Sequence, residues 1–251
     1  VLSCQGMSAR ECDFIAILFV NMTLEDWNYG TPKYQITAKQ LAYYFNINSK
    51  HVGCNFTPVI ERLSHRRFEL EKVNTIGSRE YDYVPLFEQI SYQNGYLTVI
   101  PNRELKDVYL RSTEYYQNIN LSVYLTLKKE YSKKLYELLC ALRYTGFTSR
   151  DIGISTLKHI FGIANIFGQV REDKKSFRTT NVFMQRCIRD SLEELLCNEA
   201  SLQKVDFIVI RSGRCIQSIR FKIQWKSNVC IPFSYLRSDS RFTIPVVIDS
   251  N

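Results

Sequence analysis

Residues 180–225 read TNVFMQRCIRDSLEELLCNEASLQKVDFIVIRSGRCIQSIRFKIQW, and this segment holds the clearest pattern in the chain. Its first part predicts an amphipathic helix over 180–198, because apolar residues recur there at helical spacing. The residues of this apolar stripe are Met184, Ile188, Leu192 and Leu195. Its second part predicts a hairpin, since residues 205–210 and 216–225 alternate as strands around Arg211-Ser212-Gly213-Arg214. The tip of that hairpin is basic.

The other face of this helix is charged, and Arg186 and Arg189 lie toward its N-terminal end. A basic helix fits the major groove of DNA, which is roughly 12 Å wide, and there an arginine fork can bridge O6 and N7 of guanine. Gln185 and Asn181 suit adenine or phosphate. The alternative is a solvated helix face without a ligand.

The residues before this helix complete an order of elements. Residues 131–144 form an amphipathic helical pattern, and residues 155–163 predict a short helix. A polar loop follows over 168–177. The order helix, short helix, basic helix and hairpin is that of a winged helix-turn-helix.

The first half of the chain repeats this order. Helical periodicity over 8–26 is followed by Thr37-Ala38-Lys39-Gln40, which has the form of a capping box and predicts a short helix to about residue 47. A third helical pattern follows Ser49, and Pro58 predicts that this helix is kinked or begins there.

From residue 68 the hydrophobic period becomes that of strands. Residues 68–73 and 81–87 predict one hairpin, and Gln93-Asn94-Gly95-Tyr96 predicts a type I′ turn in a second. A connecting helix over 102–111 and an extended run over 119–127 follow. We therefore predict an α+β fold of two tandem winged helix-turn-helix domains. The N-terminal domain covers residues 1–127, the C-terminal domain covers residues 128–227, and a tail of unassigned role covers residues 228–251.

The positive charge is confined to the second half. The chain has 33 Lys and Arg against 25 Asp and Glu, a net charge of +8. Residues 1–130 hold 14 basic and 14 acidic residues, residues 131–227 hold 17 and 9, and residues 228–251 hold 2 and 2. The whole excess therefore lies in residues 131–227, which favours a cationic face for a polyanion.

Two groups of residues are candidates for contact with DNA. In the second half they lie on the basic helix, just before it and at the hairpin tip: Arg178, Thr180, Asn181, Gln185, Arg186, Arg189, Arg211 and Arg214. In the first half, where the charges balance, weaker candidates surround the third helix: Lys50, Arg62, Arg66 and Arg67. Lys174 and Lys175 fit either a phosphate grip or a plain charged loop, because Glu172 and Asp173 lie beside them.

The sequence contains no motif for catalysis or metal binding. The three histidines form neither His-x-His nor His-Glu-x-x-His, and no glycine-rich loop ends in Gly-Lys-Ser/Thr. Glu193 and Glu194 are adjacent on a helix and point to different sides, so they form no acid–base pair. We predict a protein that is not an enzyme and that uses no cofactor or metal.

The cysteine usage and the absence of a targeting pattern predict the compartment. The eight cysteines are spread over the chain without a Cys-x-x-Cys pair, which favours reduced thiols over zinc or disulfides. The N-terminus has no signal-peptide pattern, and no apolar run reaches the ~20 residues of a membrane helix. We expect a soluble cytoplasmic protein without a membrane partner.

Three segments resemble the iteron-binding plasmid replication initiator (Rep) family, bacterial proteins with tandem winged-helix domains. Residues 131–139, YSKKLYELL, are similar to the family's Tyr-Ala-x-Arg-Leu-Tyr-Glu-Leu-Leu. Residues 175–195 resemble its second recognition helix, and residues 210–221 resemble its Lys-Gly-Arg hairpin followed by Ile-x-Phe. The chain departs from the family at Met184, where a basic residue is common, and at Glu194-Leu195-Leu196, where Glu-Ile-Asn is common.

The resemblance implies monomers that bind double-stranded DNA at direct repeats of a plasmid origin, open nearby DNA and recruit host replication proteins. It also implies dimers that repress their own gene, with the N-terminal domain supplying much of the dimer contact and auxiliary DNA contacts. The C-terminal domain would supply the main DNA readout. Two alternatives stay open: a winged-helix transcription repressor without a role in replication, and a DNA-nicking enzyme that uses Tyr115 or Tyr116.

Overall fold

The computed structural model describes residues 6–73, 79–116, 119–147, 149–165, 167–198 and 202–226. The described residues group into two compact units, one of residues 17–114 and one of residues 6–16 with 115–226. Helix α1 (Ala9–Asn21) contributes residues to both. The tail 228–251 and the side chains of Tyr115 and Tyr116 lie outside the described residues. The roles predicted for residues 1–127 and 128–227 stay predictions.

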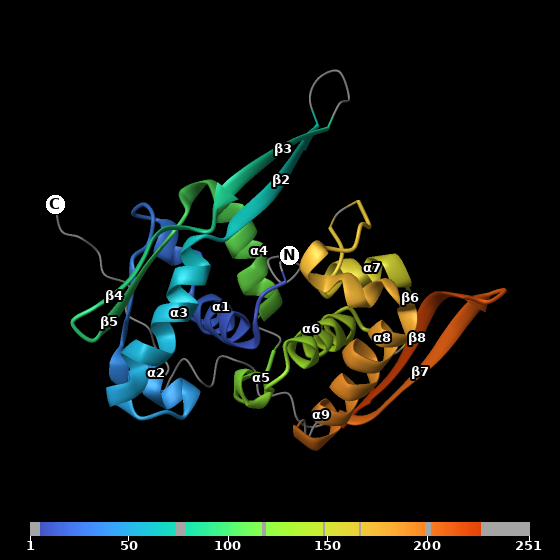
Figure 1. Cartoon of the computed structure of the whole chain (residues 1–251). Helices are drawn as coiled ribbons and strands as arrows, with labels where there is room; N and C mark the ends of the chain where they lie inside the picture. The colour runs from blue at the N-terminus through green and yellow to red at the C-terminus, as the bar shows by residue number, and fades with distance from the viewer. Residues whose placement is uncertain are drawn as a thin grey trace. The chain divides into compact units, whose positions relative to one another are not determined.

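The unit of residues 17–114 has the winged-helix order that the sequence predicts (Figure 1). A short strand, two helices and a hairpin follow one another, and the sheet order is β1-β5-β4. These elements are β1 (Tyr34–Thr37), α2 (Ala38–Phe45), α3 (Val52–Ser64), β4 (Phe87–Gln93) and β5 (Tyr96–Pro101). A second hairpin lies between α3 and β4, made of β2 (Arg67–Val73) and β3 (Arg79–Pro85). Helix α4 (Lys106–Tyr116) follows the sheet.

Local sequence signals set the ends of these elements. The capping box is confirmed, because the Thr37 hydroxyl accepts the backbone N–H of Gln40 at 3.2 Å and the Gln40 side chain accepts that of Thr37 at 2.9 Å. The type I′ turn is also confirmed, with φ of 52° at Asn94 and 79° at Gly95. Helix α3 begins at Val52 and continues through Pro58, so it does not begin at the proline.

Aromatic side chains fill the core of this unit. Tyr109 is fully buried on α4, and its ring lies 5.8 Å from that of Phe19 and 6.2 Å from that of Trp27. Its hydroxyl donates to the carbonyl oxygen of Leu86. This bond satisfies the one polar atom of a large apolar ring, which is what a buried tyrosine requires.

The other unit repeats the same order, which confirms two tandem winged helices (Figure 1). Its sheet order is β6-β8-β7, which matches β1-β5-β4 element for element. The elements of this unit are α6 (Glu130–Tyr144), β6 (Ser149–Gly153), α7 (Ile154–Ile160), α8 (Thr180–Phe183), α9 (Asp190–Asn198), β7 (Leu202–Ser212) and β8 (Cys215–Trp225). Strand β6 has no counterpart in the sequence prediction, because Ile152 is its only buried residue and no alternation is visible.

The extended run predicted over 119–127 is wrong. Residues Leu121–Thr126 form helix α5, and the side chain of Asn120 caps it by accepting the backbone N–H of Val123 at 3.3 Å. Leu121 and Tyr124 are both buried and lie three residues apart, which is helical spacing. The mixture of β-branched and aromatic residues in this short segment hid that period.

The predicted helix 180–198 is one continuous helix, which we call the reading helix. It is α-helical over α8 and α9 and π-helical from Met184 to Arg189. Buried pairs occur at 183/184, 187/188 and 191/192, a repeat of four residues rather than 3.6. A wider π-helical turn keeps such pairs on one face, so the local sequence period accounts for the π-helical segment.

Candidate nucleic-acid interface

The reading helix separates an apolar face from a charged one. All four residues of the predicted stripe are buried, at 0–7% exposure: Met184, Ile188, Leu192 and Leu195. Arg186 and Arg189 are exposed on the other side, together with Gln185 and Asn181. Thr180, at the start of the helix, is half-buried. The packing of the stripe therefore fixes which side chains face solvent.

Gln185 connects two charged neighbours on this face. Its amide nitrogen donates to Asp190 Oδ1 at 2.6 Å, and its amide oxygen accepts from Arg189 Nη1 at 3.5 Å. The first bond is short and the second is at the limit of a hydrogen bond. Contact between Gln185 and a base would therefore require the amide to leave Asp190.

Arg186 lies beside an aromatic ring. Its guanidinium carbon is 6.0 Å from the centroid of the Phe177 ring, close enough for a cation–π interaction. Phe177 is buried and packs edge-to-face on Tyr131 of α6, with 5.4 Å between the centroids. The exposed guanidinium thus lies against the buried core.

The basic loop before the reading helix is largely neutralised by carboxylates of the loop and of α6. Lys174 donates to Glu130 Oε1 at 2.7 Å and to the hydroxyl of Tyr131 at 3.1 Å. Lys175 forms an ion pair with Glu172, and Arg178 Nη2 lies 3.5 Å from the same carboxylate. The structure thus gives Arg178, a predicted phosphate contact, an acidic neighbour.

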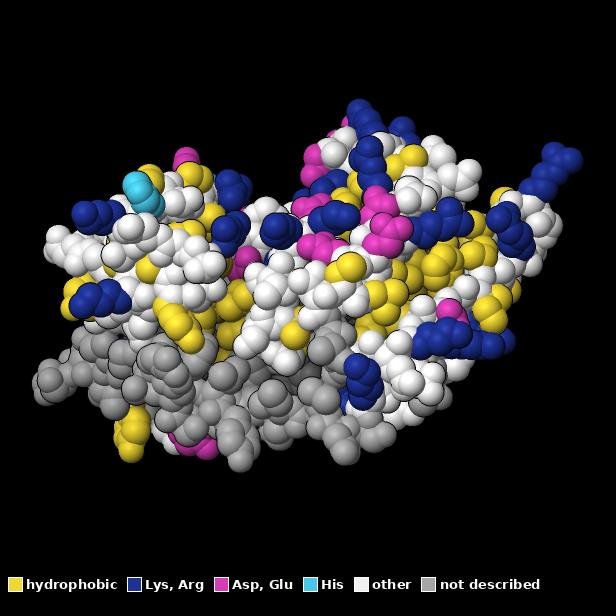
Figure 2. Space-filling model, turned by 90° about the horizontal axis from the view of Figure 1, so that it is seen from below, with side chains coloured by type: hydrophobic (Ala, Val, Ile, Leu, Met, Phe, Trp, Pro, Cys, Tyr) yellow, Lys and Arg dark blue, Asp and Glu magenta, His cyan; other side chains and the backbone are white. Residues whose placement is uncertain are grey.

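The β7–β8 hairpin carries two unopposed arginines. Ser212 pairs with Cys215 across a turn whose central residues are Gly213 and Arg214, and Gly213 has φ of 59°. Glycine with positive φ at the first central position is typical of a type II′ turn. Arg211 and Arg214 are exposed, and neither forms an ion pair with another residue in the described ranges. Figure 2 shows Lys and Arg side chains where this hairpin ends, at the right of the view.

An ion pair joins the edge strand β6 to the central strand β8 of this sheet. Arg220 on β8 faces Asp151 on β6, with Nε–Oδ1 and Nη2–Oδ2 distances of 2.5 and 2.8 Å. The arginine lowers the pKa of the Asp151 carboxyl by hydrogen bonding to its charged form. Arg220 therefore links two strands of the sheet, and its guanidinium fork is already bonded to Asp151.

The first unit presents fewer cations. Lys50 and Arg62 are exposed near the start and end of α3, Arg67 is exposed at the first position of β2, and Arg66 between them is half-buried. The wing of each unit is the last hairpin of its sheet, β4–β5 in this unit and β7–β8 in the other. The turn of the β4–β5 wing, Gln93–Tyr96, has no basic residue. The two wings therefore differ in charge although their sheets share one order.

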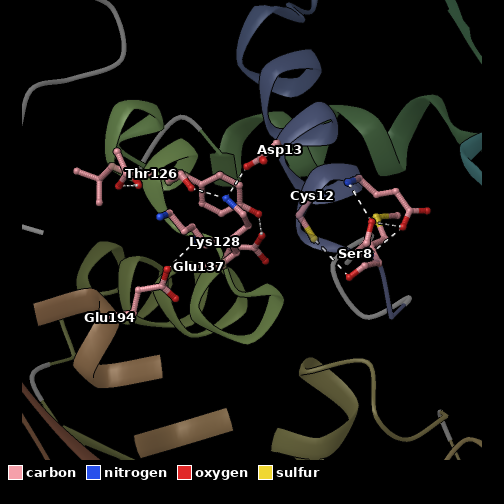
Figure 3. Close-up of polar contacts among 12 residues, drawn as sticks. Ser8, Cys12, Asp13, Thr126, Lys128, Glu137 and Glu194 are labelled. Atoms are coloured by element: carbon pink, nitrogen blue, oxygen red, sulfur yellow. Dashed lines mark hydrogen bonds and ion pairs between the residues drawn. The ribbon is translucent and has the colours of Figure 1, made fainter. Parts of the chain in front are cut away.

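Two lysines counted in the cationic excess are buried. Lys133 and Lys134 on α6 are 0% and 1% exposed. Lys133 Nζ lies 2.5 Å from Asp13 Oδ1 and 2.5 Å from the carbonyl oxygen of Tyr124 (Figure 3). Neither ammonium can meet a polyanion at the surface. The outward charge of this unit is smaller than the sequence count indicates.

The carboxyl groups near Lys133, those of Asp13 and Glu137, are buried. Burial raises the pKa of Asp13 to about 6, although Lys133 opposes the shift. The Tyr124 hydroxyl donates to buried Glu137 at 2.5 Å. No sequence motif predicted a role for Asp13, Tyr124 or Glu137. The available signal was YSKKLYELL, which combines charged residues with leucines and places Lys133 and Glu137 four residues apart, on one side of α6.

Glu194 anchors the end of the reading helix to α6. Its carboxylate accepts the backbone N–H of Lys128 at 2.7 Å and the hydroxyl of Ser132 at 2.5 Å (Figure 3). Glu193 is exposed to solvent, whereas Glu194 is half-buried, so the two adjacent side chains lie in different environments. Glu194 has a structural role that its adjacency to Glu193 did not reveal.

The described residues form no metal site and no membrane-spanning helix. No three His, Cys, Asp or Glu side chains of the described residues lie together in a way that could hold a metal ion. Six cysteines with described side chains are outside any disulfide: Cys12, Cys54, Cys140, Cys187, Cys197 and Cys215. No described helix has the length and apolar character required to cross a bilayer.

Comparison with known proteins places this geometry in context. The sequence model of a family described as "Initiator Replication protein, WH1" matches residues 2–140. A crystal structure of the Pi initiator protein in complex with iteron DNA is similar in fold, with a TM-score of 0.62 and 18% sequence identity. The match covers 88% of this chain and 95% of that one. The comparison with curated proteins found no match.

Proposed function

The chain belongs to the initiator replication protein family, and from this membership we propose that it is a plasmid replication initiator that binds iterons in double-stranded DNA. The observation that carries the proposal is the reading helix. Its apolar face is buried, and Arg186 and Arg189 are exposed on the opposite side. The crystal structure of the Pi initiator protein with iteron DNA, a protein of similar fold, supports the choice of ligand.

In this proposal the reading helix enters the major groove. Arg186 and Arg189 contact guanine edges, and Asn181 and Gln185 contact adenine or phosphate. Arg211 and Arg214 on the β7–β8 hairpin, Arg178 before the helix and Thr180 at its start contact the backbone. Each phosphate that a cation neutralises steepens the dependence of log K on log salt concentration by about 0.9.

The first unit has an auxiliary role in this proposal. Lys50, Arg62 and Arg67 are exposed around α3, and with Arg66 they provide a second, weaker contact with the backbone. The balanced charge of residues 1–130 agrees with a smaller electrostatic share for this unit.

The proposal includes self-association and further partners. A monomer binds origin repeats and recruits host replication proteins in the bacterial cytoplasm, and a dimer represses the gene of the protein itself. Family membership supports this scheme. We propose no enzymatic activity, because the groups that the described residues expose at the interface are arginines and amides, which suit binding.

The binding specificity tests the proposal directly. Duplexes selected from a random library by the full chain should converge on one short sequence, and its tandem copies should occur in the origin. A plasmid that carries the gene and these repeats should then replicate autonomously. Convergence on one sequence without plasmid maintenance would favour the transcription repressor, and selection without convergence would exclude both functions.

A second assay tests the nicking alternative. Supercoiled DNA that carries the selected repeats is incubated with the protein and Mg²⁺. We expect intact supercoiled DNA and no covalent adduct. A tyrosine-linked protein–DNA adduct would establish the nicking enzyme.

A further inference from the structure

An aromatic cluster lies beneath the start of the reading helix. It consists of Tyr131, Phe161, Phe177 and Phe183. Tyr131 of α6 is central, with its ring centroid 5.4 Å from that of Phe177 and 6.2 Å from that of Phe161. Phe161 in turn packs edge-to-face on Phe183 of the reading helix at 5.7 Å. The cluster therefore joins α6, the preceding loop and the helix itself.

Two cations lie against rings of this cluster. Lys174 Nζ is 5.3 Å from the Tyr131 centroid and is held at 2.7 Å by Glu130. The Arg186 guanidinium carbon is 6.0 Å from the Phe177 centroid. Lys174 thus has its charge satisfied within the protein, whereas Arg186 has no ion pair with any described residue and is exposed.

The contact with Phe177 suits a side chain that must stay available. A free arginine side chain samples many rotamers, and binding must restrict them. An aromatic face attracts a guanidinium without supplying a hydrogen-bond acceptor. Arg186 can therefore be held in one region while its N–H donors remain free for a base edge.

We propose that Phe177 is a positioning residue for Arg186, held in place by Tyr131, and that it improves discrimination between base pairs without itself contacting DNA. This inference rests on the proposed function of the reading helix. Tyr131 is fixed from its other side by Lys174, whose amino group donates to its hydroxyl at 3.1 Å. The orientation of Arg186 thus depends on a loop and a helix outside the groove.

Binding by three variants tests the proposal. Phe177→Leu removes the ring face and keeps an apolar side chain, Phe177→Tyr keeps the face, and Arg186→Ala removes the guanidinium. Binding is measured for the selected duplex, for duplexes with single substituted base pairs and for a scrambled duplex. Phe177→Leu should lower the preference for the selected duplex by about twofold to fivefold, the range for a cation–π contact of an exposed cation. Phe177→Tyr should restore the preference.

The combination of variants separates positioning from packing. In an Arg186→Ala background, Phe177→Leu should change the preference by less than about twofold, because the residue it positions is already gone. The single variant Phe177→Leu should keep the wild-type affinity for scrambled DNA and the wild-type salt slope. An equal loss on all duplexes, or the full effect of Phe177→Leu in the Arg186→Ala background, would overturn the positioning role.

A measurement on the unaltered protein needs neither DNA nor a folded variant. The ring current of Phe177 should shift the Arg186 Hδ resonances upfield relative to those of Arg189 in the NMR spectrum. Equal shifts for the two arginines would overturn the contact itself while leaving the proposed function intact. Conversely, a wild-type protein without preference among duplexes would remove the proposed function and this inference together.

Discussion

The ammonium of Lys133 lies 2.5 Å from a carboxylate oxygen of Asp13, 120 positions earlier in the chain, and the two side chains are 0% and 5% exposed. This ion pair joins the first half of α1 to α6. Both charges have left water, so each depends on the other for compensation. The pair is a structural requirement within the unit that carries the reading helix.

Lys133→Met should destabilise the protein strongly at pH 8, where Asp13 is ionised. The methionine keeps most of the apolar stem and leaves a buried carboxylate without its cation, which costs roughly 3 to 5 kcal/mol. Urea denaturation measures the free energy of unfolding. Lys222→Met, at an exposed lysine of β8, is the matched control and should cost less than about 0.5 kcal/mol. A loss of similar size in both variants would contradict the buried pair.

The same pair predicts a specific dependence on pH. The pKa of Asp13 is raised from 3.8 to about 6, so between these values the folded state holds a proton that the unfolded state has released. The stability that this proton supplies is fully present below about pH 4 and is lost as the pH rises through about 6. The stability of the wild type relative to Asp13→Asn should therefore fall over this interval. A difference that stays constant from pH 4 to 7 would rule out the raised pKa.

Arginines of the helix and of the wing should affect DNA binding differently. Arg186→Ala should cost about 1 to 3 kcal/mol on the selected duplex and little on scrambled DNA, because a base contact carries sequence preference. Arg214→Ala should weaken binding to both duplexes alike and reduce the salt slope by about 0.9. Fluorescence anisotropy over a series of salt concentrations measures both quantities. Arg111→Ala, at an exposed position of α4, is the control. Equal losses on both duplexes for Arg186→Ala would refute its assignment to a base.

Gly213→Ala should distort the wing. The φ of 59° at Gly213 is a conformation that costs an L-residue roughly 1 to 2 kcal/mol. We expect a loss of stability of this size and weaker binding to all duplexes, because Arg214 is the next residue in the turn. Gly153→Ala, at φ of −62°, serves as the control, since its new methyl group would meet Thr156 only at 3.7 Å. Equal effects at the two glycines would show that backbone conformation is not the cause.

The sequence predicted most of the architecture, because its strongest signals are local. The capping box at Thr37, the Asn94-Gly95 turn and the stripe of the reading helix each depend on neighbours within a few residues, and all three are confirmed. Helix α5 and the strands β1 and β6 were missed. Each is short, and β6 is stabilised by its pairing with β8, which is distant in the chain.

The candidate site was only partly predictable for a related reason. Periodicity placed Arg186 and Arg189 on an exposed face, but a count of charges could not distinguish surface lysines from Lys133 and Lys134, which are buried. The contact of Phe177 with Arg186 and that of Glu194 with the backbone of Lys128 involve separate elements. Such contacts depend on tertiary packing, which hydrophobic period does not encode.

The π-helical segment Met184–Arg189 has a consequence for a single-residue deletion in the reading helix. Such a segment accommodates an additional residue within a helix, and one residue corresponds to a rotation of about 100° around the helix axis. Deletion of a single codon there would convert the segment to a regular α-helix and turn Arg186 relative to the anchored C-terminal part. Such a deletion would change the direction in which Arg186 projects, while Leu192 and Leu195 keep their places in the core.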